Sequence, residues 1–254
     1  MEPREVQKPF WKRWLRMTWR LFVRSPIRFG ILIALLGLFD SSAVNLAYGY
    51  IIPRIWTDRL GMLLLPLLFA IISAVARGAD DSRQTWKVLQ EFLHLRFWLK
   101  ALAAGGVLVI FDLAVHALLI FSDPIAKATY TQRPGALLES FAVQTVLVSQ
   151  FLGICHAPLS VFWPQLSFRE TQNLSQSAST VNGRWQICKL VCGVLAVGIP
   201  LEMIPTYGMA EAAWLVFIGT LNYVAYRDIF ERQAENLPAL VEPVTGHEVM
   251  PLTE

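Results

Sequence analysis

The amino-acid sequence predicts an all-α protein: a polytopic transmembrane bundle of about six helices with an N-terminal interfacial amphipathic helix. Hydrophobic residues make up 55% of the 254 positions and charged residues only 16%, whereas soluble domains carry about 25% charged residues. Charged residues are also scarce in several long apolar runs. This pattern excludes an intrinsically disordered chain, a collagen-like or coiled-coil rod and a secreted disulfide scaffold, since the three cysteines lie inside apolar runs.

Residues 1–28 predict a basic amphipathic helix that lies on the inner leaflet of the membrane. Between Phe10 and Phe22 apolar residues recur at helical spacing, while basic residues step by four along another face. Each surface Lys or Arg contributes about 1 kcal/mol of attraction to anionic lipid. Ser25-Pro26 should end this helix and turn the chain into the bilayer. The residues expected to anchor it, or alternatively to dock a partner, are Trp11, Lys12, Trp14, Arg16 and Arg20.

The region 29–230 predicts the six-helix transmembrane domain. A bilayer core about 30 Å thick needs roughly 20 apolar helical residues, and six stretches qualify: 29–52, 60–76, 97–121, 137–162, 185–204 and 212–226. In the third stretch, Gly105-Gly106 should allow a neighbouring helix to approach closely. The polar segment 167–183 predicts a flexible cytoplasmic loop, and 231–254 a disordered acidic cytoplasmic tail.

The distribution of basic residues predicts the orientation of these helices. Of the 22 Lys and Arg residues, 18 fall on the side that holds both termini. The other four lie in the connections on the opposite side: Arg54, Arg59, Lys127 and Arg133. Because cytoplasmic loops carry an excess of Lys and Arg, we expect both termini in the cytoplasm.

Polar side chains within the apolar stretches are the candidate functional residues, since a charge at the membrane centre costs about 2.5–3.5 kcal/mol. Asp112 and His116 are four residues apart, so a carboxylate can hold an imidazole on one helix face. The intramembrane candidates are Asp40, Asn45, Asp112, His116 and Gln150. Two interpretations stay open: the side chains bond across helices as structural contacts, or Asp40, Asp112 and His116 line the path of a small ion- or proton-coupled transporter or channel.

Cysteine and histidine offer a weak pattern for a metal. Cys188 and Cys192 lie four residues apart, and adjacent Cys155 and His156 can reach a similar depth. Thiolate and imidazole suit copper(I) or zinc, but no Cys-x-x-Cys or His-x-x-x-His spacing accompanies them. We therefore expect neither a metal nor any other cofactor.

The sequence lacks the motifs that mark common enzymes. There is no Gly-x-Ser-x-Gly, His-Glu-x-x-His, Walker or Gly-x-Gly-x-x-Gly motif. The leading hypothesis is a non-enzymatic membrane protein that binds a membrane or cytoplasmic protein partner, as an accessory subunit of an envelope complex or an immunity or assembly factor. We expect contact with anionic lipid and no nucleic-acid partner, while an enzyme acting on lipid is a poorer alternative.

Three short segments carry a resemblance to a family. They are Leu21-Phe22-Val23-Arg24-Ser25-Pro26-Ile27-Arg28-Phe29, Ala74-Val75-Ala76-Arg77-Gly78-Ala79-Asp80 and Tyr223-Val224-Ala225-Tyr226-Arg227-Asp228-Ile229-Phe230. Together they resemble a family of uncharacterised six-helix bacterial inner-membrane proteins. The resemblance implies a bacterial inner membrane and six helices, and it carries over no catalytic residue.

Overall fold

The computed structural model describes residues 2–6, 8–48, 54–81, 95–122, 153–202 and 209–231. The helix ends 39–48, 54–59, 115–122 and 198–202, together with Asp112, Leu195 and Glu211, are described as backbone only. These residues form eight α-helices, one π-helical turn and no strand. The elements are α1 (Phe10–Arg24), α2 (Pro26–Tyr48), α3 (Arg54–Asp80), α5 (Leu95–Ser122), α8 (His156–Phe162), α9 (Phe168–Val181), α10 (Arg184–Glu202), α11 (Met209–Tyr226) and the π-helical turn η2 (Arg227–Glu231). The all-α fold class is therefore confirmed.

Most of the predicted apolar stretches coincide with helices. Those at 29–52, 60–76, 97–121, 185–204 and 212–226 correspond to α2, α3, α5, α10 and α11. Most of the stretch 137–162 lies outside the described residues, and its last part forms α8. The tail from 232 onward, expected to be disordered, also lies outside them.

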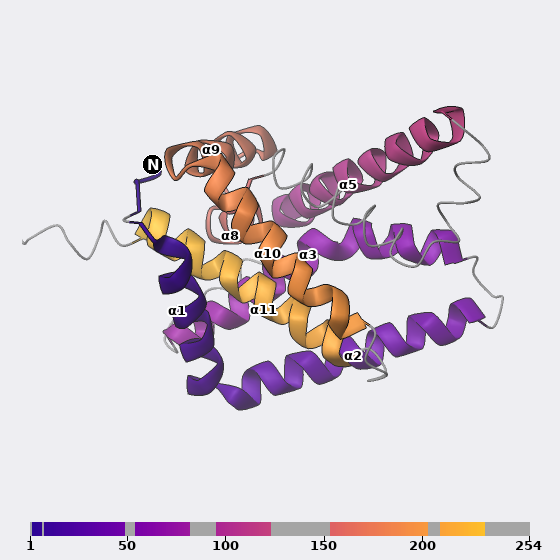
Figure 1. The fold of residues 1–254 in the computed structure, drawn as a ribbon, viewed down its shortest axis with the longest axis horizontal. Helices are drawn as coiled ribbons and strands as arrows, with labels where there is room; N and C mark the ends of the chain where they lie inside the picture. The colour runs from indigo at the N-terminus through magenta and orange to yellow at the C-terminus, as the bar shows by residue number, and fades with distance from the viewer. Residues whose placement is uncertain are drawn as a thin grey trace, which may run out of the picture.

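Helices α3 and α11 form the centre of the bundle. α11 packs against α1, α2, α3 and α10, while α3 also contacts α5 and α8. Figure 1 shows α2, α3 and α5 extending away from the end of the molecule that holds α1, α8, α9 and the N-terminus. Large buried side chains such as Ile72 on α3 and Val216 and Tyr223 on α11 fill this centre.

Part of this bundle is long and apolar enough to cross a membrane. Within the described side chains, Leu60–Asp80 of α3 is long and apolar enough to cross a membrane by itself. The pair Phe10–Arg24 and Pro26–Leu38 qualifies only when taken together as one broken span, bent by 94°. One or two candidate spans are therefore present among the described residues, and the six-span bundle is not confirmed.

The break between α1 and α2 lies where the sequence predicts it. Ser25 caps α1, its N–H donating to the carbonyl of Leu21 at 3.1 Å. Pro26 then occupies the first position of α2, where its missing N–H leaves no hydrogen bond unmade and its fixed φ suits a helix start. The chain thus turns sharply between two intact helices.

The apolar face of α1 packs on the protein itself, while the expected contact of this helix with lipid stays a prediction. Phe10, Trp14, Thr18 and Leu21 are buried, and Trp14 belongs to the same core as α11. An indole needs a hydrogen-bond acceptor when it is buried, and the core supplies one that an acyl chain does not offer. Helix α1 is therefore an integral part of the fold.

The expectation of a flexible loop at 167–183 is wrong, because most of it forms α9. Ser167 and Glu170 make a capping box in which each side chain accepts a hydrogen bond from the other residue's backbone N–H. The small residues Ser175, Ala178 and Ser179 form the buried face of the helix. Gly153 has a φ of +77° and lies so close to Ser175 that a side chain would not fit, so the two segments pack backbone to backbone.

Gly105 makes the predicted close helix contact, whereas its neighbour does not. A Cβ at Gly105 would overlap the backbone carbonyl of Leu63 on α3. A Cβ at Gly106 would meet nothing within 4 Å. Of the two glycines, Gly105 is therefore the one whose missing side chain permits the close approach of α3 and α5.

Candidate functional site

Three segments that are far apart in the sequence meet at the end of the bundle that holds the N-terminus. They are the segment before α1 with α1 itself, the end of α3, and the end of α11 with η2. Their interacting side chains form what we call the ionic cluster: Arg4, Arg13, Trp14, Arg77, Asp80, Tyr223, Arg227, Asp228 and Glu231.

Asp228 lies at the centre of the ionic cluster and its side chain is fully buried. Trp14 donates its indole N–H to Oδ2 at 2.8 Å, and Arg4 donates to Oδ1 at 3.2 Å. Arg13 donates to Oδ2 as well. A buried carboxylate is tolerated only when charges and hydrogen bonds compensate its lost hydration. These three donors supply that compensation, and they fix α1 against η2.

A second set of contacts joins the end of α3 to the same region. Asp80 accepts a hydrogen bond from the hydroxyl of Tyr223 at 3.1 Å and an ion-pair contact from Arg227. Arg77 pairs with Glu231 at 2.8 Å, and its guanidinium lies 4.4 Å from the ring centre of Phe162. The ends of α3 and α11 are therefore held by charge-assisted bonds, which are stronger than neutral ones.

Asn182 holds the N-terminal segment at the edge of the ionic cluster. Its side-chain oxygen accepts from the backbone N–H of Val6 at 2.7 Å, and its Nδ2 donates to the carbonyls of Arg4 and Ala178 at 3.0 and 2.9 Å. The backbone N–H of Arg4 donates to the carbonyl of Ile229 at 3.3 Å. These bonds tie the segment before α1 to both α9 and η2.

The three segments that carry the family resemblance all reach this region. Arg28 donates to the carbonyl of Gly78, and Asp80 bonds both Tyr223 and Arg227. Sequence reasoning missed Asp228, Asp80 and Tyr223 as a connected group, because acidic and tyrosine residues at helix ends are ordinary in isolation. No local pattern in the sequence marks these three residues as a group.

The outward face of α1 is a second candidate, which we call the basic face. It consists of Lys12, Arg16, Trp19, Arg20, Val23 and Arg24, all exposed. Trp19 and Val23 keep 63% and 64% of their surface exposed, and Trp11 beside them keeps 44%. Of the two tryptophans expected to dock a partner, Trp11 is therefore accessible while Trp14 is buried. The basic face thus combines four long cations, Lys12, Arg16, Arg20 and Arg24, with the exposed ring of Trp19.

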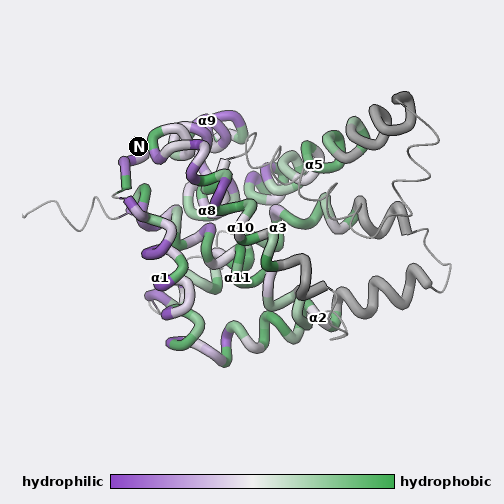
Figure 2. The backbone as a smooth tube through the Cα atoms, viewed as in Figure 1, coloured by the Kyte–Doolittle hydropathy of each residue, from purple (hydrophilic) through white to green (hydrophobic). Residues whose placement is uncertain are grey.

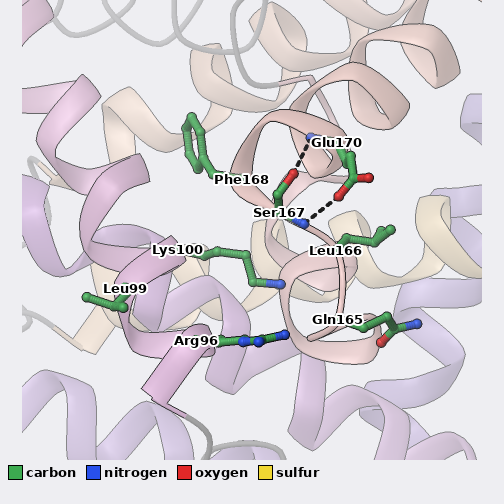
Figure 3. A pocket seen from close by; sticks show the side chains of 8 residues that line it. All are labelled: Arg96, Leu99, Lys100, Gln165, Leu166, Ser167, Phe168 and Glu170. Atoms are coloured by element: carbon green, nitrogen blue, oxygen red, sulfur yellow. Dashed lines mark hydrogen bonds between the residues drawn. The ribbon is translucent and has the colours of Figure 1, made fainter.

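A pocket of about 370 Å³ lies between the start of α5 and the connection from α8 to α9. Arg96, Lys100 and Glu170 are its charged lining residues, and Leu99 and Phe168 are among its apolar ones. Figure 3 shows the Arg96 and Lys100 side chains extending in the same direction, toward the connection. The Lys100 ammonium group donates to the carbonyls of Ser160, Trp163 and Pro164 at 3.2–3.3 Å.

The intramembrane candidates from the sequence are mostly beyond what the structure describes. Asp40 and Asn45 lie on α2, and Asp112 and His116 on α5, but their side chains are outside the described residues, as is all of Gln150. The structure therefore does not show whether these side chains approach one another. The transport hypothesis built on them stays a prediction.

The candidate metal ligands are better described. Cys155 and His156 are buried beside α9, and Cys188 and Cys192 lie one turn apart on α10. Burial leaves the Nε2 of His156 without a hydrogen-bond partner. Among the described residues, no three His, Cys, Asp or Glu side chains come together in a way that could hold a metal ion.

Comparison with family models, with curated proteins and with solved structures finds no match to this chain. The site's own geometry therefore carries the functional argument. Asp228, at the centre of the ionic cluster, is buried and bonded on both carboxylate oxygens, which fits a structural clamp. The basic face and the pocket are open to a ligand.

Proposed function

We propose that this chain is a multi-pass protein of a bacterial inner membrane, non-enzymatic, which docks a protein partner through the basic face of α1. The proposal includes six membrane spans with both termini in the cytoplasm. The observation that carries it is that Arg13 and Trp14 bond Asp228 on one side of α1 while the basic face on the other side stays exposed.

Exposed apolar residues support the membrane location. On α2, four large apolar residues are at least 57% exposed: Ile27, Ile31, Leu35 and Leu38. On α5, Leu99 and Ile110 are 58% and 66% exposed. Exposed apolar surface of this extent marks contact with lipid or with another protein. Helices that are apolar on most sides are typical of membrane spans.

The segregation of polar residues supports the orientation. In Figure 2 the hydrophilic segments gather on α1, α9 and the N-terminal end, while α2, α3 and α5 are predominantly hydrophobic along their described lengths. The basic residues of α1 lie at this polar end. An excess of Lys and Arg at one end of a bundle favours a cytoplasmic position for that end.

The chemistry of the basic face favours a protein over a lipid surface. An interfacial helix binds a membrane by inserting a continuous apolar face into the acyl boundary. In α1 that face is already used in the protein core. What remains outward combines Arg side chains with Trp19, and arginine and tryptophan are enriched among the residues that dominate protein interfaces. The partner that complements this face carries an acidic surface.

The test is recovery of a stoichiometric partner from cells at native expression under mild detergent. We expect the double variant Arg16→Glu, Arg20→Glu to lose that partner, because both side chains are exposed and neither belongs to the ionic cluster. The matched control reverses two exposed charges elsewhere, Arg169→Glu with Arg184→Glu, and should keep the partner. Recovery of the wild-type chain alone in several detergents, or equal loss in both variants, contradicts the proposal.

A further inference from the structure

The pocket between α5 and the α8–α9 connection has a chemistry that the docking function does not use. Two of its lining residues are cations, Arg96 and Lys100, against one carboxylate, that of Glu170. The Glu170 carboxylate accepts the backbone N–H of Ser167 at 2.7 Å as part of the capping box of α9. Because the two cations outnumber this one carboxylate, the lining has a net positive charge and favours an anion.

Arg96 and Lys100 are positioned differently for such a ligand. They are four residues apart on α5, so they lie on the same face. Lys100 is buried and held by three carbonyls at the end of α8 and beyond it, which keeps its charge in one place. Arg96 is exposed at the mouth of the pocket. Its planar guanidinium is suited to binding two oxygens of a phosphate at once.

The apolar residues around the pocket select among phosphate compounds. Leu99 lines the pocket and is 58% exposed, and Phe168 lies on its other side. Leu95 and Leu102 add exposed apolar surface on the same helix, at 71% and 42%. A soluble phosphate ester would leave this surface uncovered, whereas acyl chains extending from a bound headgroup would cover it.

We propose that this pocket binds the headgroup of an anionic phospholipid, with the phosphate bound by the guanidinium of Arg96 and attracted by the fixed charge of Lys100, and with the acyl chains along the exposed leucines of α5. The proposal rests on the membrane location within the proposed function, but not on the docking of a partner through α1. It places the binding site at the polar end of the bundle, where headgroups of the inner leaflet lie. The site thus fixes the depth of α5 in the bilayer.

The experiment measures lipid retention by the full-length chain purified in detergent. Native mass spectrometry would count lipids bound after titration with phosphatidylglycerol or, as a neutral-headgroup comparison, phosphatidylcholine. We expect one phosphatidylglycerol retained in preference to phosphatidylcholine. Arg96→Gln should weaken this retention by about tenfold, since a charge-assisted bond to phosphate is lost. Arg169→Gln, an exposed arginine on α9 that does not line the pocket, should retain the lipid as the wild type does.

A second arm separates the sources of phosphate. Excess inorganic phosphate should compete poorly, because it does not cover the apolar surface; full displacement by inorganic phosphate would assign the site to a soluble anion and overturn the lipid proposal. Equal retention of the two lipids, or equal loss in both arginine variants, would also overturn it. Thermal unfolding of each variant checks folding, and Arg96→Lys, which keeps the charge, should recover part of the binding.

The outcome is independent of the docking proposal. The variant Arg16→Glu, Arg20→Glu should retain phosphatidylglycerol normally, because these residues lie on α1 and do not line the pocket. A chain that recovers its partner but shows no lipid preference refutes the pocket proposal alone. A chain that shows the lipid preference but no partner refutes the docking proposal alone.

Discussion

Trp14 donates its indole N–H to the carboxylate of Asp228, 2.8 Å away, although 214 positions separate the two residues in the sequence. This bond links the first helix of the chain to the turn that follows its last described helix. Both side chains are fully buried, so the contact forms only when α1 and α11 are correctly packed. The presentation of the basic face depends on it.

Replacing Asp228 should destabilise the protein more than any single change to its donors. Asp228→Ala leaves the guanidinium of Arg13 and the indole of Trp14 without their acceptor, and breaking a buried ion pair costs about 3–5 kcal/mol. Trp14→Phe removes one hydrogen bond but keeps most of the ring packing, at a cost of about 1–3 kcal/mol because an acceptor loses a donor. The midpoint of thermal unfolding in detergent should therefore be lower for Asp228→Ala than for Trp14→Phe. The reverse order would contradict the role of Asp228 in holding α1 to η2.

Alanine substitutions at the two adjacent glycines of α5 should change the stability of the protein in opposite directions. Gly105→Ala places a Cβ against the Leu63 carbonyl, and overpacking of this kind costs about 1–3 kcal/mol. Gly106→Ala meets open space, and replacing a helix-interior glycine by alanine favours the helix by about 1 kcal/mol. The unfolding midpoint should fall for the first variant and stay level or rise for the second. Equal shifts would show that α3 and α5 are not in close contact.

Local sequence patterns predicted the helices because the length and apolar character of each stretch indicate its secondary structure. The helix break at Ser25-Pro26 was likewise predictable, since proline disfavours the helical conformation of the residue before it. The role of Trp14 was not predictable in this way. Its spacing placed it correctly on the apolar face of α1, but an apolar face is compatible with lipid or with a protein core. Only its acceptor, Asp228, distinguishes the two, and the sequence does not state that pairing.

The segment that forms α9 was misjudged for a different reason. Its Ser, Thr, Asn and Gln residues are typical of loops, and such residues compete with the helix backbone for hydrogen bonds. The capping pair Ser167 and Glu170 is a start signal for a helix, and it outweighs the weak propensities that follow. Small side chains such as Ser175 and Ala178 were then needed for close packing rather than for flexibility.

The capping box of α9 predicts a dependence of local stability on pH. Hydrogen bonds from the backbone N–H of Ser167, and then from its side chain, lower the pKa of the Glu170 carboxyl. A carboxyl whose pKa is lower in the folded state stabilises that state above its unfolded pKa, about 4.3 for Glu, and the contribution is lost as the pH falls through the folded pKa. Hydrogen exchange of the first turn of α9 should therefore become less protected in acid.

Two variants isolate this effect. Glu170→Gln keeps a side-chain oxygen but cannot titrate, so the first turn of α9 should show the same relative protection on either side of the carboxyl titration. Ser167→Ala removes the side-chain cap and should destabilise the helix by about 1 kcal/mol at neutral pH. An acid-sensitive first turn that persists in Glu170→Gln would assign the titration to another group.

The proposed topology is tested by reporter fusions, because the distribution of 18 and four basic residues leaves little freedom of orientation. A reporter that matures only in the periplasm should be active when fused after Ser122 or Thr131, and inactive when fused after Asn173 or Glu235. The fusion after Asn173 tests the orientation of the whole polar end, because α9 packs beside α8 and α10 there. Activity there would put the ionic cluster and the basic face on the periplasmic side, where a cytoplasmic partner cannot reach them. Inactivity at all four positions would instead show that the chain after α3 does not cross the membrane as proposed. The chain would then have fewer spans, and the basic face would still be accessible from the cytoplasm.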